Sequence, residues 1–553
     1  MNHLRVLRAT LCWVVLGLTG LGGVAAAPDV DRVNEIMFLV GDNRLNEALE
    51  QAHLLMTQEP EDVRGYYYFT WVLAKLDRLA WGERYFLEKL KRDPDNAYYL
   101  FALGTNYRIQ TDYPRAIEFL ENAIARRPRQ DMFFDIYLLA VDVTGEHQRA
   151  LNFLLGLRRL DPDNCYLTSS IAELHYYLDD YNGFFRWEEV ARAQNPEILS
   201  TSILTIVRYQ MEGRDDKAMA LARQRADEAG HAGRLRDQAY YLQQIGNLHL
   251  YASEYEKCRA VADEAFSLCA IIGDEELERN IEQLYANYYA QLGDHLLAQE
   301  HFRNVMRHAE QTKHIRRQAD IHVQLGLCSE RMGNLQGALD AYNQSLVLSV
   351  KVQQRSSQVQ ALKKLADLKH RLYEYDDAEA FYQQALRMTR ETNDPFSETV
   401  LEADLGILDQ TRKQHEAAME HFRKSLEIAD RMRLQYQKGV VLECMGWSLF
   451  KMDRRAEAYT YVENARRLFA EIREDGAVAD CDWVIGHFLY KQDQFVEALD
   501  QFQKVLAATR RLNSRAFEVG TLRAMGACYR KLGRTAEAID HYQRALDYLE
   551  EIE

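Results

Sequence analysis

The feature that most constrains the fold is a regular spacing of small side chains in the second half of the chain. Glycine or alanine stands at every fortieth position over eight anchors, namely Gly246, Ala286, Gly326, Ala366, Gly406, Gly446, Gly486 and Gly526. Twelve residues after each lies another small residue, alanine in seven cases of eight, and an aromatic or aliphatic residue follows four further on. Small residues let two antiparallel helices approach closely, and one helical hairpin cannot bury its apolar face alone. The spacing therefore predicts a stack of helical hairpins.

Prolines set a shorter period in the first half. Five of the eight prolines are evenly spaced, each thirty-four positions after the one before: Pro60, Pro94, Pro128, Pro162 and Pro196. Because the residue before a proline is pushed out of the helical region, each of these prolines should end a second helix. Pro114 falls in the first turn of such a helix, where its missing N–H costs nothing. With only 28 glycines in 553 residues, the chain has too few turn residues for an all-β fold.

The two periods divide the chain into two arrays. We predict about six 34-residue units over 28–232 and about eight 40-residue units over 233–553. The period changes between Asp227 and Arg236, where Gly230 and Gly233 mark a joint. Six extra residues lengthen a unit by about 9 Å of helix. A continuous superhelix and a bend between two arrays are both compatible with this joint.

The small, small and aromatic columns resemble the tetratricopeptide repeat family over about residues 29 to 553. The 40-residue units are similar to those of bacterial quorum-peptide receptors and polarity scaffolds. The resemblance implies an all-α fold, an α-solenoid wound as a right-handed superhelix of about 14 helix-turn-helix units. It also implies that partners bind on the concave face, which the first helix of each unit lines.

The resemblance also supplies a first set of partner-binding candidates. In the family, positions 2, 5, 9 and 12 of each first helix point into the groove when the glycine anchor is position 8. In the second and third repeats these positions give Arg64, Tyr67, Trp71, Tyr98, Phe101 and Arg108. Aromatic residues and arginine dominate interface hot spots. The alternative is that the aromatic residues simply pack between helices.

The same positions give a second set at the start of the 40-residue array: Gln243, Asn247, Gln283 and Asn287. A side-chain amide is both a donor and an acceptor, so a ladder of amides can hold an extended peptide backbone whatever its sequence. The alternative is ordinary solvated polarity. Later repeats break the ladder, since position 9 becomes Leu327 and then Asp367. A uniform peptide groove along the whole array is therefore not expected.

The N-terminus has the pattern of a secretory signal. Arg5 and Arg8 precede an apolar stretch from Ala9 to about Val24, and the small residues 25–27 follow. The stretch is shorter than the ~20 residues of a membrane-spanning helix. We predict a signal peptide over 1–27 that is cleaved, with a retained anchor as the alternative. The mature protein would be periplasmic or secreted, or membrane-tethered if the signal stays.

No motif for catalysis or cofactor binding stands outside the repeats. The patterns HExxH, GxxxxGK(S/T) and GxSxG are absent from the sequence. His301 and His308 are two helical turns apart, about 10 Å, which is too far to chelate one ion unaided. Seven cysteines follow the signal without a CxxC spacing, and we interpret them as core thiols. We therefore expect no enzyme, no metal and no cofactor.

The charge balance narrows the class of partner. The formal net charge is −16, which disfavours nucleic acid and anionic membrane surfaces. We expect other proteins or extended peptides to bind a non-enzymatic scaffold that acts in envelope assembly or organisation. The alternative is a sensor, in which a peptide or small ligand closes the superhelix and alters a second contact. The sequence does not fix the oligomeric state.

Overall fold

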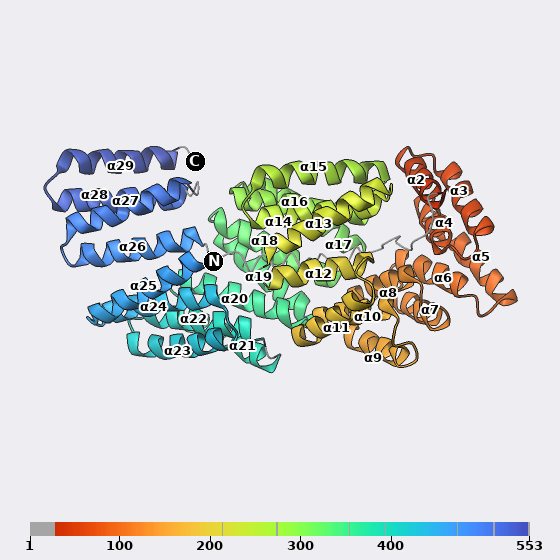
Figure 1. Cartoon of the computed structure of the whole chain (residues 1–553), viewed down its shortest axis with the longest axis horizontal. Coiled ribbons are helices and arrows are strands. Elements are labelled where there is room, and N and C mark those ends of the chain that lie inside the picture. The colour runs from red at the N-terminus through yellow and green to blue at the C-terminus, as the bar shows by residue number, and fades with distance from the viewer. Residues whose placement is uncertain are drawn as a thin grey trace. The chain divides into compact units, whose positions relative to one another are not determined.

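The described chain is built from helices alone. The computed structural model describes residues 28–212, 214–272, 275–352, 354–392, 394–472, 474–511 and 515–550, so the predicted signal segment lies outside the described residues. Within these ranges there are 28 helices and no strand (Figure 1). Twenty-eight helices make 14 hairpins, and the expected all-α solenoid is confirmed.

The first eleven helices are short, with 12 to 14 residues each. They are α2 (Pro28–Gly41), α3 (Leu45–Gln58), α4 (Val63–Lys75), α5 (Leu79–Arg92), α6 (Ala97–Ile109), α7 (Tyr113–Arg126), α8 (Asp131–Thr144), α9 (His147–Arg158), α10 (Cys165–Tyr177), α11 (Tyr181–Gln194) and α12 (Leu199–Met211). Each spaced proline follows the end of a second helix, as the sequence predicts, and Pro114 lies in the first turn of α7. The 34-residue period is therefore set by short helices that end before a proline.

The later helices are longer, with 16 to 18 residues each. They are α13 (Asp215–His231), α14 (Leu235–Tyr251), α15 (Tyr255–Ile272), α16 (Glu275–Leu292), α17 (His295–Gln311), α18 (Ile315–Arg331), α19 (Leu335–Lys351), α20 (Arg355–Arg371), α21 (Tyr375–Glu391), α22 (Pro395–Thr411), α23 (His415–Arg431), α24 (Gln435–Lys451), α25 (Arg455–Glu471), α26 (Asp475–Lys491), α27 (Phe495–Arg511), α28 (Arg515–Lys531) and α29 (Thr535–Glu550). The lengthening begins at α13, next to the change of period.

The small anchors work by close approach. A β-carbon placed on Gly406 of α22 would lie 2.5 Å from the ring of Phe422, a fully buried residue of α23. The same geometry recurs at Gly526, 2.8 Å from the ring of Tyr542. The second anchors, such as Ala418, are fully buried. The glycine column therefore exists because the aromatic column fills the space that a side chain would need.

The chain divides into two compact units. Unit 1 contains residues up to Ala361 and unit 2 begins at Leu362, inside α20. This boundary does not coincide with the change of period near Gly233. In unit 1 a single apolar core runs from Val33 to Tyr288 and passes through the change of period without a break.

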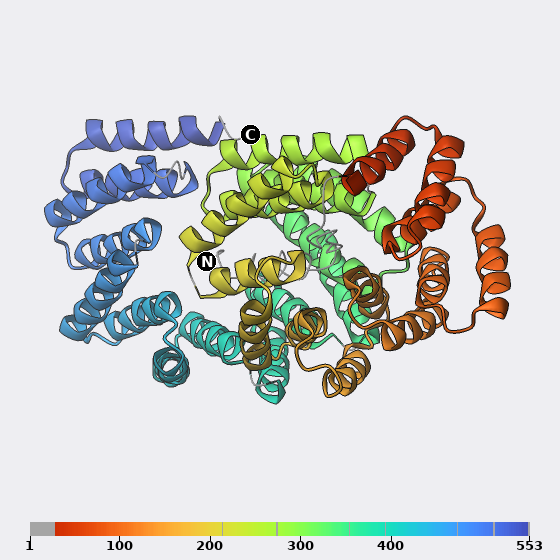
Figure 2. The ribbon, with the colours of Figure 1, turned by 45° about the vertical axis from the view of Figure 1, so that its right-hand side comes forward.

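Within unit 1, segments far apart in sequence meet. Helix α2 lies against α15, and α8 lies against α18 (Figure 2). The amide of Asn34 in α2 donates to the carbonyl of Gly233 at 2.8 Å, and the Tyr113 hydroxyl donates to the carbonyl of Thr312. Each of these pairs is 199 residues apart. The ends of the 40-residue repeats therefore contact the 34-residue array.

The anchor geometry gives a stability prediction. Gly406→Ala should lower the free energy of unfolding by about 1–3 kcal/mol, because the added methyl group overlaps the Phe422 ring. Gly156→Ala in α9 is the matched control, since nothing lies within 4 Å of its added methyl group. That control should be neutral or stabilising by up to about 1 kcal/mol. Urea unfolding of both variants measures the difference, and equal effects would contradict the packing account.

Candidate binding surfaces

The first predicted set of partner-binding residues lies on α4 and α6, which are first helices of their hairpins. Tyr98 and Phe101 are buried, and the other four members (Arg64, Tyr67, Trp71 and Arg108) are half-buried. Phe101 stacks on Phe133 of α8 with ring centroids 4.8 Å apart. The six residues thus lie on two first helices that contact each other, and Phe101 packs between repeats, as the alternative interpretation has it.

The α13–α14 junction, which consists of the loop and the first residues of α14, covers part of this face. The guanidinium of Arg236 lies 6.0 Å from the Tyr67 ring centroid. A small cavity is lined by Met37 and Arg64 on one side and by Arg234 and Arg236 on the other. Arg64 is itself paired with Asp62 at 2.6 Å. A partner role for this face stays a prediction, and any partner there would compete with the α13–α14 junction.

The second predicted set, the amide set, lies on α14 and α16. Gln243, Asn247 and Gln283 are buried and Asn287 is half-buried, so solvated polarity does not describe the first three. Gln244 donates to the Gln243 side chain at 3.0 Å, and Gln283 donates to Asn287 at 3.3 Å. The amide set is therefore partly bonded to itself and largely shielded from water.

Two members of the amide set keep unused hydrogen-bonding capacity. Neither the amide nitrogen nor the amide oxygen of Asn247 has a hydrogen-bond partner among the described residues, although only 2% of this residue is exposed. The carboxamide oxygen of Gln283 also lacks a partner there. Each unpartnered buried polar group costs about 1–3 kcal/mol. A peptide backbone, which offers one donor and one acceptor per residue, can satisfy both atoms of Asn247.

An acidic stripe was missed by the sequence analysis. It consists of Asp131, Asp135 and Asp142 on α8 and Glu173 on α10. The signal was available, since Asp135 and Asp142 stand one 34-residue period after Phe101 and Arg108, and Glu173 stands two such periods after Thr105. The two predicted sets come from the second and third repeats and from the start of the 40-residue array, so neither set includes these acids.

Asp142 is the hub of a buried ionic cluster. Its carboxylate lies 2.8 Å from Arg316, 3.0 Å from His314 and 3.1 Å from His147. Burial by itself favours the neutral acid, but the Arg316 charge and the histidine hydrogen bonds outweigh it, so the pKa of Asp142 lies well below its usual range. Removing one partner of such a buried pair typically costs about 3–5 kcal/mol. The cluster therefore fixes α8 against the α17–α18 loop.

The other three acids of the stripe have the opposite electrostatics. Burial raises the pKa of Asp131 to about 6 and raises the pKa of Asp135 and of Glu173 well above their ordinary values. The charge of Arg236 offsets only part of this effect at Asp135, and the Tyr177 hydroxyl donates to Glu173 at 3.3 Å. The stripe thus has more carboxylates than the chain supplies with cations.

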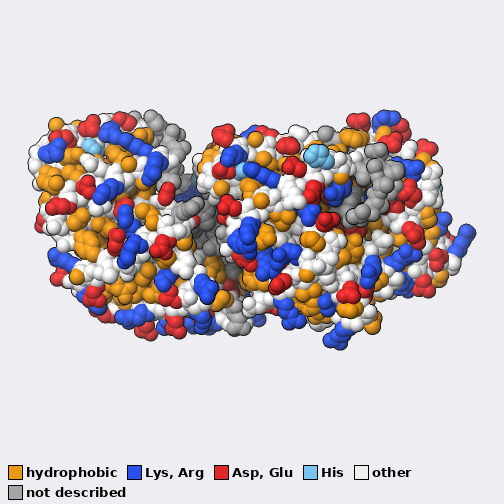
Figure 3. Space-filling model, in the orientation of Figure 1, with side chains coloured by type: hydrophobic (Ala, Val, Ile, Leu, Met, Phe, Trp, Pro, Cys, Tyr) orange, Lys and Arg blue, Asp and Glu red, His pale blue; other side chains and the backbone are white. Residues whose placement is uncertain are grey.

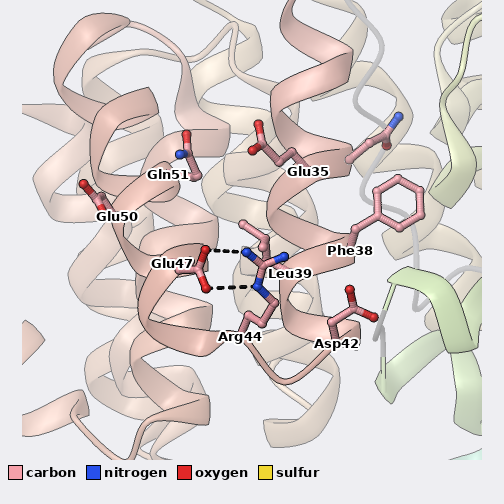
Figure 4. A pocket seen from close by; sticks show the side chains of 9 residues that line it. Glu35, Phe38, Leu39, Asp42, Arg44, Glu47, Glu50 and Gln51 are labelled. Atoms are coloured by element: carbon pink, nitrogen blue, oxygen red, sulfur yellow. Dashed lines mark hydrogen bonds and ion pairs between the residues drawn. The ribbon is translucent and has the colours of Figure 1, made fainter.

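A separate acidic cavity of about 450 Å³ lies between α2 and α3 (Figure 4). Arg44 forms a two-point ion pair with Glu47 there, and Glu35, Asp42 and Glu50 lie around it. Elsewhere, acidic and basic side chains are interspersed over the face seen in Figure 3. Among the described residues no group of three or more His, Cys, Asp or Glu is arranged to hold a metal ion.

The histidine and cysteine interpretations can be compared with the structure. His301 shares one hydrogen bond with Glu282 at 2.7 Å and stacks on Tyr289, so it is a half-buried packing residue. Burial raises the pKa of the Cys258 thiol to about 12 and that of Cys328 to about 11. These two cysteines are core thiols, as expected. None of the described helices combines the length and apolarity that a membrane span requires.

Helical hairpins that stack in series define an α-helical repeat solenoid. A sequence model of the tetratricopeptide repeat family matches residues 317–391, 357–431 and 482–551. The matches confirm tetratricopeptide repeats in the chain. A search of curated proteins found no match.

Solved helical-repeat structures align with the chain at low identity. The Cut9–Hcn1 heterotetramer of APC/C aligns at 10% identity and TM-score 0.49, covering 98% of this chain and 99% of that one. Yeast Tom70 aligns at 12% identity and TM-score 0.43, covering 80% and 96%. A Rap protein complexed with competence and sporulation factor aligns at 13% identity and TM-score 0.46, covering 64% and 98%.

The raised pKa of Asp131 gives a pH prediction. A carboxyl group whose folded pKa is about 6 destabilises the folded state while it is ionised, and this penalty fades as the pH falls from 6 towards 3.8. Asp131→Asn should therefore stabilise the protein by about 1–3 kcal/mol at pH 8, and by clearly less at pH 5.

The measurement is urea unfolding at both pH values. The matched control is Asp163→Asn, an exposed turn residue, which should be neutral at both. An Asp131→Asn effect that is equal at pH 5 and pH 8 would contradict the assigned pKa.

Proposed function

We propose that the protein is an exported, non-enzymatic scaffold that binds other proteins or extended peptides, and that it acts in envelope assembly or organisation. The observation that carries the binding proposal is Asn247, whose two amide atoms are buried without a partner among the described residues. Export rests on the N-terminal pattern of Arg5, Arg8 and the apolar stretch after them.

The binding mode follows from the chemistry of the amide set. An extended peptide along α14 and α16 would accept a hydrogen bond from the Asn247 amide nitrogen and donate one to its oxygen. The free carboxamide oxygen of Gln283 would accept a second backbone N–H. Backbone recognition sets affinity without choosing a sequence, so the choice of partner has to come from side-chain contacts elsewhere in unit 1.

A sensor is the second candidate, and one observation favours it. Arg236 at the start of α14 lies over Tyr67, so a ligand that moves the α13–α14 junction would uncover part of the first-helix face of α4 and α6. In that case the bound peptide is a signal and the uncovered face is the second contact.

The binding proposal predicts a loss of partner on removing the amides. Asn247→Ala combined with Gln283→Ala should weaken binding at least 10-fold, because all three backbone hydrogen bonds of the proposed binding mode are lost. Gln336→Ala combined with Gln383→Ala is the matched control, since both glutamines are exposed on second helices and each bonds an acid four residues away along its helix.

The experiment has two steps. Mature protein first captures a stoichiometric partner from envelope extract, and calorimetry with the purified partner then compares the variants. Equal affinity of the amide variant and the control would reject the amide set as the binding site. Compaction by a short peptide in X-ray scattering, without a stoichiometric protein, would favour the sensor.

Export has a separate test. In a bacterial host the periplasmic protein should begin near Pro28, after cleavage that follows Ala26 or Ala27. Replacing residues 25–27 with leucine should leave the full-length precursor, because the small residues needed for cleavage are gone. N-terminal sequencing and intact mass measure this. An unprocessed wild-type chain in the cytoplasm would contradict export.

A further inference from the structure

Two arginines at equivalent repeat positions are buried against the 34-residue array. Arg236 and Arg316 stand two 40-residue periods apart, at the starts of α14 and α18. Only 6% and 5% of them are exposed, and arginine is rarely buried this far unless it is paired. The Arg316 guanidinium lies 4.9 Å from the Tyr177 ring of α10, as Arg236 lies over Tyr67 of α4. Each arginine therefore sits in a site formed by an earlier first helix.

The site of Arg316 is the more complete of the two. Its guanidinium contacts the Asp142 carboxylate on α8 and faces the Tyr177 ring, which combines an ion pair with a cation–π contact. The carbonyl of Thr312, at the start of the α17–α18 loop, accepts a hydrogen bond from Tyr113 of α7. The 312–317 segment consists of the α17–α18 loop and the first three residues of α18. It is thus seated on the array like a bound peptide with one arginine.

The acidic stripe extends beyond the part that the 312–317 segment occupies. Asp131, Asp135 and Asp142 follow one another at spacings of four and seven residues, so they lie on one side of α8. Arg316 forms its ion pair with Asp142, whereas the interaction of Asp135 with Arg236 is a longer-range electrostatic one. Among the described residues neither Asp135 nor Glu173 forms an ion pair, and Glu173 accepts a hydrogen bond from the uncharged Tyr177 hydroxyl.

We propose that the acidic stripe is a docking surface for a partner segment that carries two arginines, and that the chain's own 312–317 segment occupies one end of the stripe until such a segment displaces it. The proposal rests on the proposed protein-binding function and names a sequence preference for it. Arginine fits better than lysine, because its planar fork binds a carboxylate in two places and stacks on an aromatic ring.

The spacing of the carboxylates sets the spacing of the arginines. Asp135 and Asp142 are seven residues apart on α8, which is about 10 Å along the helix. In a polyproline II peptide, residues three apart lie on the same side and are separated by about 9 Å. A segment of the form Arg-x-x-Arg therefore matches the stripe. A peptide with a single arginine would bind weakly, because the 312–317 segment belongs to the same chain and competes at an effective concentration of about millimolar.

The test uses the mature full-length chain and a synthetic peptide with two arginines separated by two prolines. The peptide should bind, and the same peptide with citrulline in place of both arginines should not. Asp135→Asn combined with Glu173→Gln should weaken binding at least 10-fold. Arg316→Met, which removes the chain's own arginine, should tighten binding at least 5-fold. Arg433→Met is the matched control, since Arg433 is exposed and should leave the affinity unchanged.

Hydrogen exchange of the wild-type chain keeps the proposal testable even if Arg316→Met does not fold. Adding the peptide should speed exchange of amides in 312–320 and slow exchange in 131–142. Unchanged exchange in 312–320, or equal binding of the citrulline peptide, would overturn the proposal. Asn247→Ala with Gln283→Ala should still bind the peptide, so failure of the amide site and failure of the acidic stripe are distinguishable.

Discussion

The whole structure depends on the fact that a helical hairpin has an apolar face that it cannot bury alone. Each hairpin is covered by its neighbours, so the chain grows as an array and not around one central core. Close approach is possible only where the anchors are small, as Gly406 is against Phe422. The aromatic column then fills the space between hairpins, and the same solution is repeated along unit 1 and unit 2.

An array of this kind leaves its first-helix face open unless something else covers it. In unit 1 the later repeats do so, but through polar contacts at helix ends, such as Asn34 with Gly233 and Asp142 with Arg316. Hairpin packing buries apolar area, whereas these contacts exchange water for ion pairs and hydrogen bonds with a smaller net gain. The contacts between the two halves of unit 1 should therefore open before the hairpins do.

This difference explains what the sequence could predict. The anchor columns and Pro114 are local, because each acts within one hairpin and its neighbour, and the helices lie where the columns place them. Asp135 and Glu173 stand at the repeat positions of Phe101 and Thr105, one and two 34-residue periods later, so their positions follow from the same local pattern. The contact of Asp142 with Arg316 spans 174 residues, so it depends on the summed rotation of several repeats, which no local pattern contains.

The amide set and the acidic stripe of unit 1 both contain buried polar groups that selection for stability alone would not favour. Asn247 holds two amide atoms without a partner among the described residues, and burial at Asp135 outweighs the charge of Arg236. Apolar residues at these positions would cost less, so their presence points to function rather than to folding. The amide set and the acidic stripe also recognise different parts of a partner. Amides recognise backbone and supply affinity for any extended segment, whereas carboxylates beside aromatic rings recognise arginine. A scaffold that uses both can bind its partner tightly and still choose it by sequence.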